Sequence, residues 1–101
     1  MTVQELLDSP EKWTKHNYAK QRFSEENSTI VNPEDPVANC WCLHGAIIKC
    51  YGRQNDEASE ARTKLYKAIE ETYGRESIAI FNDAKETTFE HIQKVIKEAN
   101  I

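Results

Sequence analysis

The stretch DPVANCWCLHGAIIKCYG, residues 35–52, decides the fold expected for this chain of 101 residues. Asp35-Pro36 is a strong helix-start signal, because Asp is a good N-cap and Pro fits the first helical position, and Gly52 is the matching stop. Placed on a helical wheel at about 100° per residue, the residues in between are apolar over most of the circumference. Such a helix is normally the buried centre of a domain. The stretch therefore predicts a central helix from Pro36 to Tyr51.

Gly45 lies in the middle of this predicted helix. Glycine at such a position lowers helix stability by about 1 kcal/mol relative to alanine, so its presence needs another reason. Because glycine has no Cβ, we expect Gly45 to allow the close approach of a neighbouring helix or loop.

Length and composition bound the class of protein. At 101 residues and 11.7 kDa the chain fits one domain, residues 1–101. Hydrophobic residues make up 39% and charged residues 30%, with only three Gly and three Pro, which is typical of a helix-rich globular domain. No apolar run approaches the roughly 18 residues of a membrane span, and the N-terminus lacks a signal-peptide pattern. We therefore expect a cytoplasmic protein with no membrane contact.

The signals elsewhere in the chain predict further helices. An N-terminal helical stretch comes first, an amphipathic helix begins at Asn55 or Asp56 and ends at Gly74, and the last helix begins near Thr87. Residues 17–34 carry no helical period, and the motif RFSEENSTIV favours a hairpin or a long loop. The expected fold class is mainly α: a compact bundle of about four helices around a buried central helix, with a small hairpin or extended loop.

All three cysteines, Cys40, Cys42 and Cys50, lie on the predicted central helix. Cys42 and Cys50 would be separated by about 12 Å of helical rise, whereas a disulfide needs Cα atoms within about 7 Å. Cys40 and Cys42 would point to nearly opposite sides of the helix. We therefore expect three reduced thiols packed in the core, which suits a cytoplasmic protein.

Cys40 and His44 would share one face of that helix and could supply two metal ligands. A metal needs three or four converging ligands, and Cys42 would point away, so we expect no metal and no cofactor. A catalytic thiol usually lies at a helix N-terminus or in an exposed cleft, whereas Cys40 and Cys42 fall inside the first two turns. These residues favour a protein that is not an enzyme.

A second group of polar residues follows an apolar run in SIAIFNDAKETTFE, residues 77–90. Asn82 and Asp83 tolerate turn geometry and bond to nearby backbone, so they could hold the turn into the last helix. They could instead be polar groups at the mouth of a pocket. The candidate pocket then consists of Cys40, His44, Asn82 and Asp83.

The charge distribution bears on the partner. A net charge of −4 argues against a nucleic-acid-binding surface, because phosphate contacts need clustered Lys and Arg. The densest basic stretch is KWTKHNYAKQR at residues 12–22. It is either an aromatic and basic surface for nucleic acid or an acidic partner, or a set of solvated lysines beside aromatic anchors of the core. Irregular segments with aromatic and Arg residues often carry binding energy. The candidate partner-binding residues are Trp13, Tyr18, Arg22 and Phe23.

Several short motifs occur in a fixed order along nearly the whole chain. They are Trp13-Thr14, Tyr18-Ala19, Pro36-Val37-Ala38, WCLHGAI from Trp41 to Ile47, and IFND from Ile80 to Asp83. Together they resemble a family of small bacterial and phage proteins of unknown function with a central C-L-x-G-A-I motif and a later F-N-D motif. The resemblance implies a compact helical fold and supplies no catalytic residue. This chain has a longer segment between Tyr18 and Pro36 than typical members, which concerns the hairpin and not the helices.

Function is expected by elimination. The sequence has no glycine-rich phosphate loop, no convincing ligand cluster and no carboxylate pair with interpretable spacing. We therefore expect a small acidic cytoplasmic protein that binds a partner protein as an adaptor or inhibitor, by analogy with phage-encoded inhibitors of host machines. The alternative is a small-molecule or metal-dependent activity centred on the pocket of Cys40, His44, Asn82 and Asp83.

Overall fold

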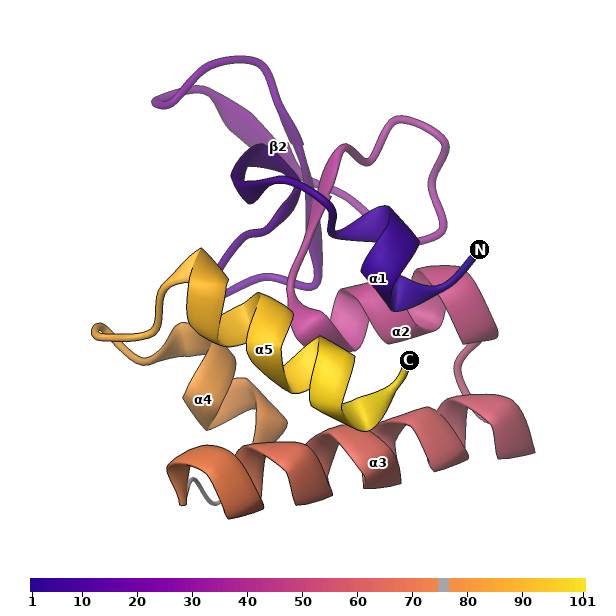
Figure 1. Ribbon diagram of the computed structural model, residues 1–101. Helices are drawn as coiled ribbons and strands as arrows, with labels where there is room; N and C mark the ends of the chain where they lie inside the picture. Colours follow the sequence, from indigo (N-terminus) through magenta and orange to yellow (C-terminus); the bar gives the residue numbers. More distant parts are fainter. Residues whose placement is uncertain (75–76) are drawn as a thin grey trace.

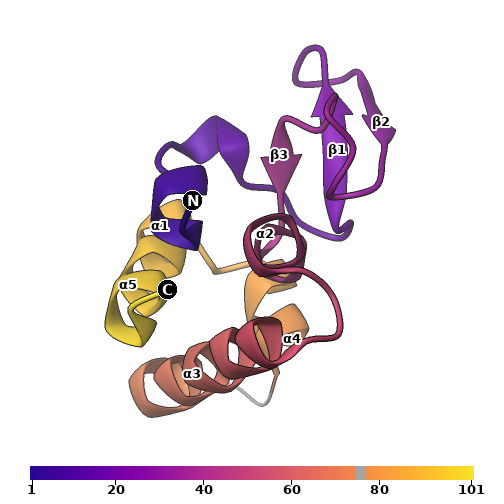
Figure 2. The same cartoon turned by 90° about the vertical axis from the view of Figure 1, so that its right-hand side faces the viewer.

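A helical body carries a projecting β-hairpin in the computed structural model, which describes residues 1–74 and 77–101 (Figures 1 and 2). The elements in chain order are α1 (Val3–Leu6), the 3-10 helix η1 (Pro10–Lys12), β1 (Ala19–Arg22), β2 (Ser28–Ile30), β3 (Cys40–Trp41), α2 (Leu43–Tyr51), α3 (Asp56–Tyr73), α4 (Ile78–Asp83) and α5 (Phe89–Ala99). The predicted mainly α class and the small hairpin are confirmed. The described residues hold five α-helices and a three-stranded sheet, rather than a bundle of about four helices. Among these helices, none combines the length and the apolar composition that a membrane crossing requires.

The predicted start of the central helix is wrong. Helix α2 begins at Leu43, with Cys42 as its N-cap, and not at Pro36, whereas the predicted stop at Gly52 is confirmed. Most of α2 is nevertheless buried, and it packs against α1, α3, α4 and β3. Helix α2 is therefore central in the fold, as expected, but it covers only the C-terminal part of the stretch predicted to be helical.

The segment before α2 is extended because it pairs with another strand. Asp35 bonds to the backbone of a turn rather than capping a helix. Its Oδ1 accepts from the Val37 N–H at 3.0 Å, and its carbonyl oxygen accepts from the Ala38 N–H. The next residues, Cys40–Trp41, form β3 and pair antiparallel with β1. This pairing satisfies backbone groups that a helix would otherwise bond internally.

The core lies mainly between α2, α3 and α5, with α1 and α4 closing its ends (Figure 1). Its almost fully buried members on these helices include Leu43, Ala46 and Ile47 of α2, Ala58, Leu65 and Ile69 of α3, and Ile92, Val95 and Ile96 of α5. The amphipathic helix predicted to end at Gly74 is α3, and its buried face includes Ala58, Leu65 and Ile69.

Gly45 allows a close approach, as predicted. A Cβ at this position would lie 1.8 Å from the carbonyl oxygen of Tyr18. The same oxygen accepts a hydrogen bond from the Cys42 N–H at 3.2 Å. The chain entering β1 therefore lies directly on the first turn of α2, and this contact fixes the base of the hairpin relative to the helices.

Candidate functional site

Asn82, in the last turn of α4, is the centre of the most connected polar cluster. Its side chain is 1% exposed. Oδ1 accepts from Trp13 Nε1 at 2.8 Å and from the Leu43 N–H at 3.0 Å. Nδ2 donates to the Thr14 carbonyl at 3.1 Å and to Asp83 Oδ1 at 2.9 Å. Because both donors and both acceptor positions of the amide are used, Asn82 joins three segments and has no capacity left for a ligand.

Asp83 holds the loop that precedes β1. Its Oδ1 accepts from the backbone N–H of His16 at 2.9 Å, and its Oδ2 lies 3.9 Å from His16 Nδ1. His16 has φ 74°, in the left-handed region that non-glycine residues rarely adopt. The carboxylate thus stabilises a costly backbone conformation at the exposed edge of the cluster.

The cysteines lie differently from the prediction. Cys40 belongs to β3, is completely buried, and donates its thiol to the Lys20 carbonyl at 3.6 Å, so it does not share a helix face with His44. Cys42 is the N-cap of α2, and its Sγ accepts from the Gly45 N–H at 3.3 Å. Burial raises the pKa of the Cys42 thiol. A thiol that stays protonated at neutral pH is a poor nucleophile, so the geometry gives Cys42 a capping role.

A small cavity of about 50 Å³ lies where these segments meet. It is lined by His16, Asn17, Tyr18, Cys42, His44, Ala79, Asn82 and Asp83. Three members of the predicted pocket therefore meet, with Cys42 in the place of Cys40. The volume has room for a few water molecules, whereas drug-sized ligands need about 300 Å³ or more. Within residues 1–74 and 77–101, no three His, Cys, Asp or Glu side chains are grouped to hold a metal ion.

Two of the four candidate partner-binding residues make contacts within the protein. Trp13, besides its bond to α4, packs its ring against Phe89 with centroids 6.4 Å apart. Arg22 donates from its guanidinium to the Glu11 carbonyl and to Thr14 Oγ1, both at 3.2 Å. Trp13 thus connects the segment before the hairpin to α4 and α5, and Arg22 connects the hairpin to that segment.

The other two candidates are exposed. Phe23, at the turn of the hairpin, is 65% exposed, and Tyr18 is 54% exposed with its ring 6.2 Å from that of His44. Sequence reasoning missed two further exposed apolar side chains near the sheet, Ile30 and Val37. Ile30 belongs to β2, and its position near the end of the motif RFSEENSTIV, which favours a hairpin, was the sequence signal for it.

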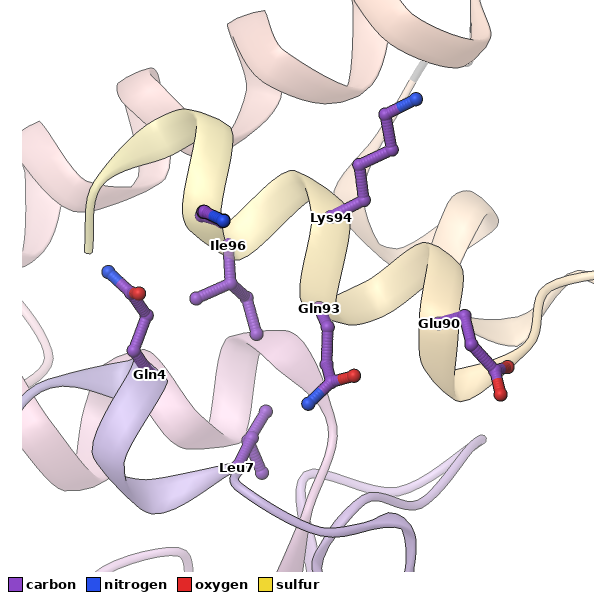
Figure 3. A pocket seen from close by; sticks show the side chains of 7 residues that line it. Gln4, Leu7, Glu90, Gln93, Lys94 and Ile96 are labelled. Atoms are coloured by element: carbon purple, nitrogen blue, oxygen red, sulfur yellow. The ribbon is translucent and has the colours of Figure 1, made fainter.

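A separate groove of about 440 Å³ lies between α1 and α5 (Figure 3). Leu7 and Ile96, which line it, are almost fully buried. In Figure 3 the side chains of Glu90 and Lys94 extend away from Leu7 rather than toward a common point. This groove offers no set of converging polar groups, so it does not define a chemical site.

Fold and site together define a mainly helical domain with a projecting hairpin, in which the buried polar cluster has structural roles. The chain belongs to a family of unknown function, DUF6197, whose model matches residues 2–100. The predicted resemblance to an uncharacterised family is thereby confirmed. The search of the curated proteins found no match, and the search of the solved structures found none.

Proposed function

We propose that this protein acts by binding a partner protein, as an adaptor or inhibitor, along the open edge of β2. The observation that carries this proposal is the exposure of apolar side chains on the hairpin and on the segments that flank it in the chain. Of the seven large hydrophobic side chains that are exposed among the described residues, four lie between residues 18 and 37: Tyr18, Phe23, Ile30 and Val37. Exposed apolar side chains that gather in one region commonly mark an interaction surface.

The two edges of the sheet differ, which favours β2. The strand order is β2-β1-β3. Along the β3 edge, Trp13 forms a parallel bridge with Trp41, and η1 packs nearby. All three residues of β2, Ser28–Ile30, are exposed. An edge strand left open in this way can accept an extended segment of another chain.

The backbone of β2 offers hydrogen-bonding groups to such a segment. The Phe23 N–H donates to the Asn27 carbonyl at 2.8 Å, and the Val31 N–H donates to the Ala19 carbonyl at 3.2 Å. Because bonded and non-bonded pairs alternate in an antiparallel ladder, the backbone groups of Ser28 and Ile30 point away from β1. Two N–H groups and two carbonyls are thus directed toward the open edge.

The exposed side chains lie on both faces of the hairpin. Ile30 is paired with Lys20, so its side chain lies on the same face as those of Lys20 and Arg22. Phe23 directly follows Arg22 in the ladder, and successive side chains alternate between faces, so Phe23 lies on the opposite face. A partner strand added at the β2 edge would reach both faces with alternate side chains. Pairing along the edge therefore accounts for both exposed residues.

The proposed setting is the cytoplasm, where the three free cysteines would stay reduced. The proposed partner is a protein rather than a nucleic acid, because the net charge is −4 and the exposed residues of β2 carry no charge.

Ile30→Ser is expected to weaken the partner complex at least tenfold, or about 1.4 kcal/mol, because it removes an apolar contact beside the paired edge. The partner is recovered from the native host with the tagged protein, purified, and its Kd is measured for each variant. Ile30 is 67% exposed, so the melting temperature is expected to change by no more than a few degrees.

Ile80→Ser is the matched control, since Ile80 is 55% exposed but lies on α4, away from the hairpin. We expect it to leave the Kd within twofold of the wild-type value. Equal Kd values for the two variants would place the partner elsewhere and remove the support for the β2 edge.

A further inference from the structure

A basin of about 350 Å³ lies between α2, the start of α3 and the chain that enters β1. It is lined by Tyr18, His44, Ile48, Arg53, Gln54 and Arg62. Every polar side chain in this set can donate a hydrogen bond, and none is a carboxylate. In a chain with a net charge of −4, a hollow lined by two guanidinium groups and no carboxylate favours an anion.

Arg62 is the cation of this basin without a compensating charge. Its neighbours three and four positions away on α3 are Ala58, Ser59, Leu65 and Tyr66, none of them acidic. Lys64, on the same helix, does have such a partner and forms an ion pair with Glu60 at 3.2 Å. In the described part of the chain, no ion pair involves Arg62. Its guanidinium is therefore available for an anion.

Arg53 is held in place at the rim. Its Nε donates to Glu34 Oε1 at 3.0 Å and its Nη2 donates to Asn32 Oδ1 at 3.1 Å. Because Glu34 neutralises much of its charge, Arg53 offers a ligand in the basin hydrogen-bond donors from its remaining N–H groups rather than a full positive charge. Arg62 is left as the main electrostatic attraction in the basin.

The apolar side of the basin is aromatic. The rings of Tyr18 and His44 lie 6.2 Å apart at an interplanar angle of 44°, and the buried side chain of Ile48 lines the basin beside them. Burial, and then the positive charge of Arg62, lowers the pKa of His44. The imidazole is thus neutral at neutral pH and offers a flat surface with one N–H donor.

We infer that this basin binds a small aromatic anion, that is, a carboxylate or phosphate group carried on a flat ring. Arg62 binds the anionic oxygens through its paired N–H groups, with Gln54 and the Tyr18 hydroxyl as further donors. The rings of Tyr18 and His44 contact the aromatic body. The volume lies within the range of small-molecule sites. None of the lining residues belongs to β2. The basin shares Tyr18 with the exposed apolar side chains counted above, and its other lining residues lie outside residues 18–37.

The test is a titration of the ¹⁵N-labelled protein with phenyl phosphate and, separately, with benzoate, followed by NMR. We expect saturable shifts in the signals of Tyr18, His44 and Arg62 with at least one of the two anions, and none with neutral benzyl alcohol. If only one of the two anions saturates, the result shows whether the basin prefers a phosphate or a carboxylate group. Saturation by neither, or equal shifts with benzyl alcohol, overturns the inference.

Arg62→Gln is expected to weaken binding of the effective anion at least tenfold, whereas Lys67→Gln removes the same charge from an exposed part of α3 outside the basin and should change the Kd less than twofold. The melting temperatures of both variants should stay within a few degrees of wild type, since both are surface changes. Tyr18→Ala should reduce the preference for phenyl phosphate or benzoate over inorganic phosphate or acetate. If Arg62→Gln and Lys67→Gln weaken binding of the anion equally, the anion is attracted by net charge alone, and the proposed site is contradicted.

Discussion

The Gly45→Ala variant is expected to lose about 3 kcal/mol of unfolding free energy, which lowers the melting temperature by roughly 10–25 °C. The new Cβ would lie 1.8 Å from the Tyr18 carbonyl oxygen and 2.7 Å from its carbon, so backbone must move. That movement also strains the bond from the Cys42 N–H to the same oxygen. The gain of up to about 1 kcal/mol in helix propensity is too small to offset these costs. Thermal and denaturant unfolding measure the change.

Gly74→Ala is the matched control for this prediction. Gly74 has φ 68° but no atom within 4 Å of the added Cβ, so only the backbone conformation opposes alanine. The expected cost is about 1–2 kcal/mol. A Gly45→Ala variant as stable as the wild type, or more stable than Gly74→Ala, would mean that the hairpin base does not lie on α2 as described.

The Asn82→Ala variant is expected to lose about 4 kcal/mol of unfolding free energy. The substitution leaves the Trp13 indole N–H, the Leu43 N–H and the Thr14 carbonyl without their partner. Each buried polar group that loses its partner costs about 1–3 kcal/mol. Since the whole stability of a small domain is about 5–15 kcal/mol, we expect a large fall in the denaturant midpoint.

Asn82→Asp separates the hydrogen bonds from the volume of the side chain. The carboxylate can still accept from Trp13, but its second oxygen would face the Thr14 carbonyl and Asp83 Oδ1, where Asn82 now donates. We expect this variant also to be strongly destabilised. Asn55→Ala, which removes the exposed cap of α3, should cost only about 1 kcal/mol. If the two Asn82 variants cost no more than Asn55→Ala, the buried network is not what joins the three segments.

Local signals in the sequence predicted the long helices well. Asn55 caps α3, Gly74 ends it, and Gly52 ends α2, because capping depends on residues close in the chain. The Asp35-Pro36 signal failed for the opposite reason. Whether Cys40–Trp41 is helical or extended depends on pairing with β1, about 20 residues earlier, which no local pattern reveals.

Members of the candidate sites could be predicted only where the residue type itself suggests a chemical or hydrogen-bonding role. Three residues of the alternative pocket, His44, Asn82 and Asp83, line one cavity, but Asn82 has a structural role and Cys42 lies there instead of Cys40. Arg62 carried no signal, because a single Arg on an exposed helix is ordinary. Its proposed role in anion binding rests on the absence of acidic residues among those that line the basin, which becomes visible only in the folded chain.

The central claim is that a partner protein contacts the hairpin at the β2 edge, and site-specific photo-crosslinking tests it most directly. A photoreactive phenylalanine analogue is placed at position 23, and in a second protein at position 66, where another exposed aromatic residue lies on α3. We expect illumination in native host extract to link one partner protein to position 23 and not to position 66. Equal crosslinking from both positions, or a product formed only between two copies of this chain, would contradict the proposed function.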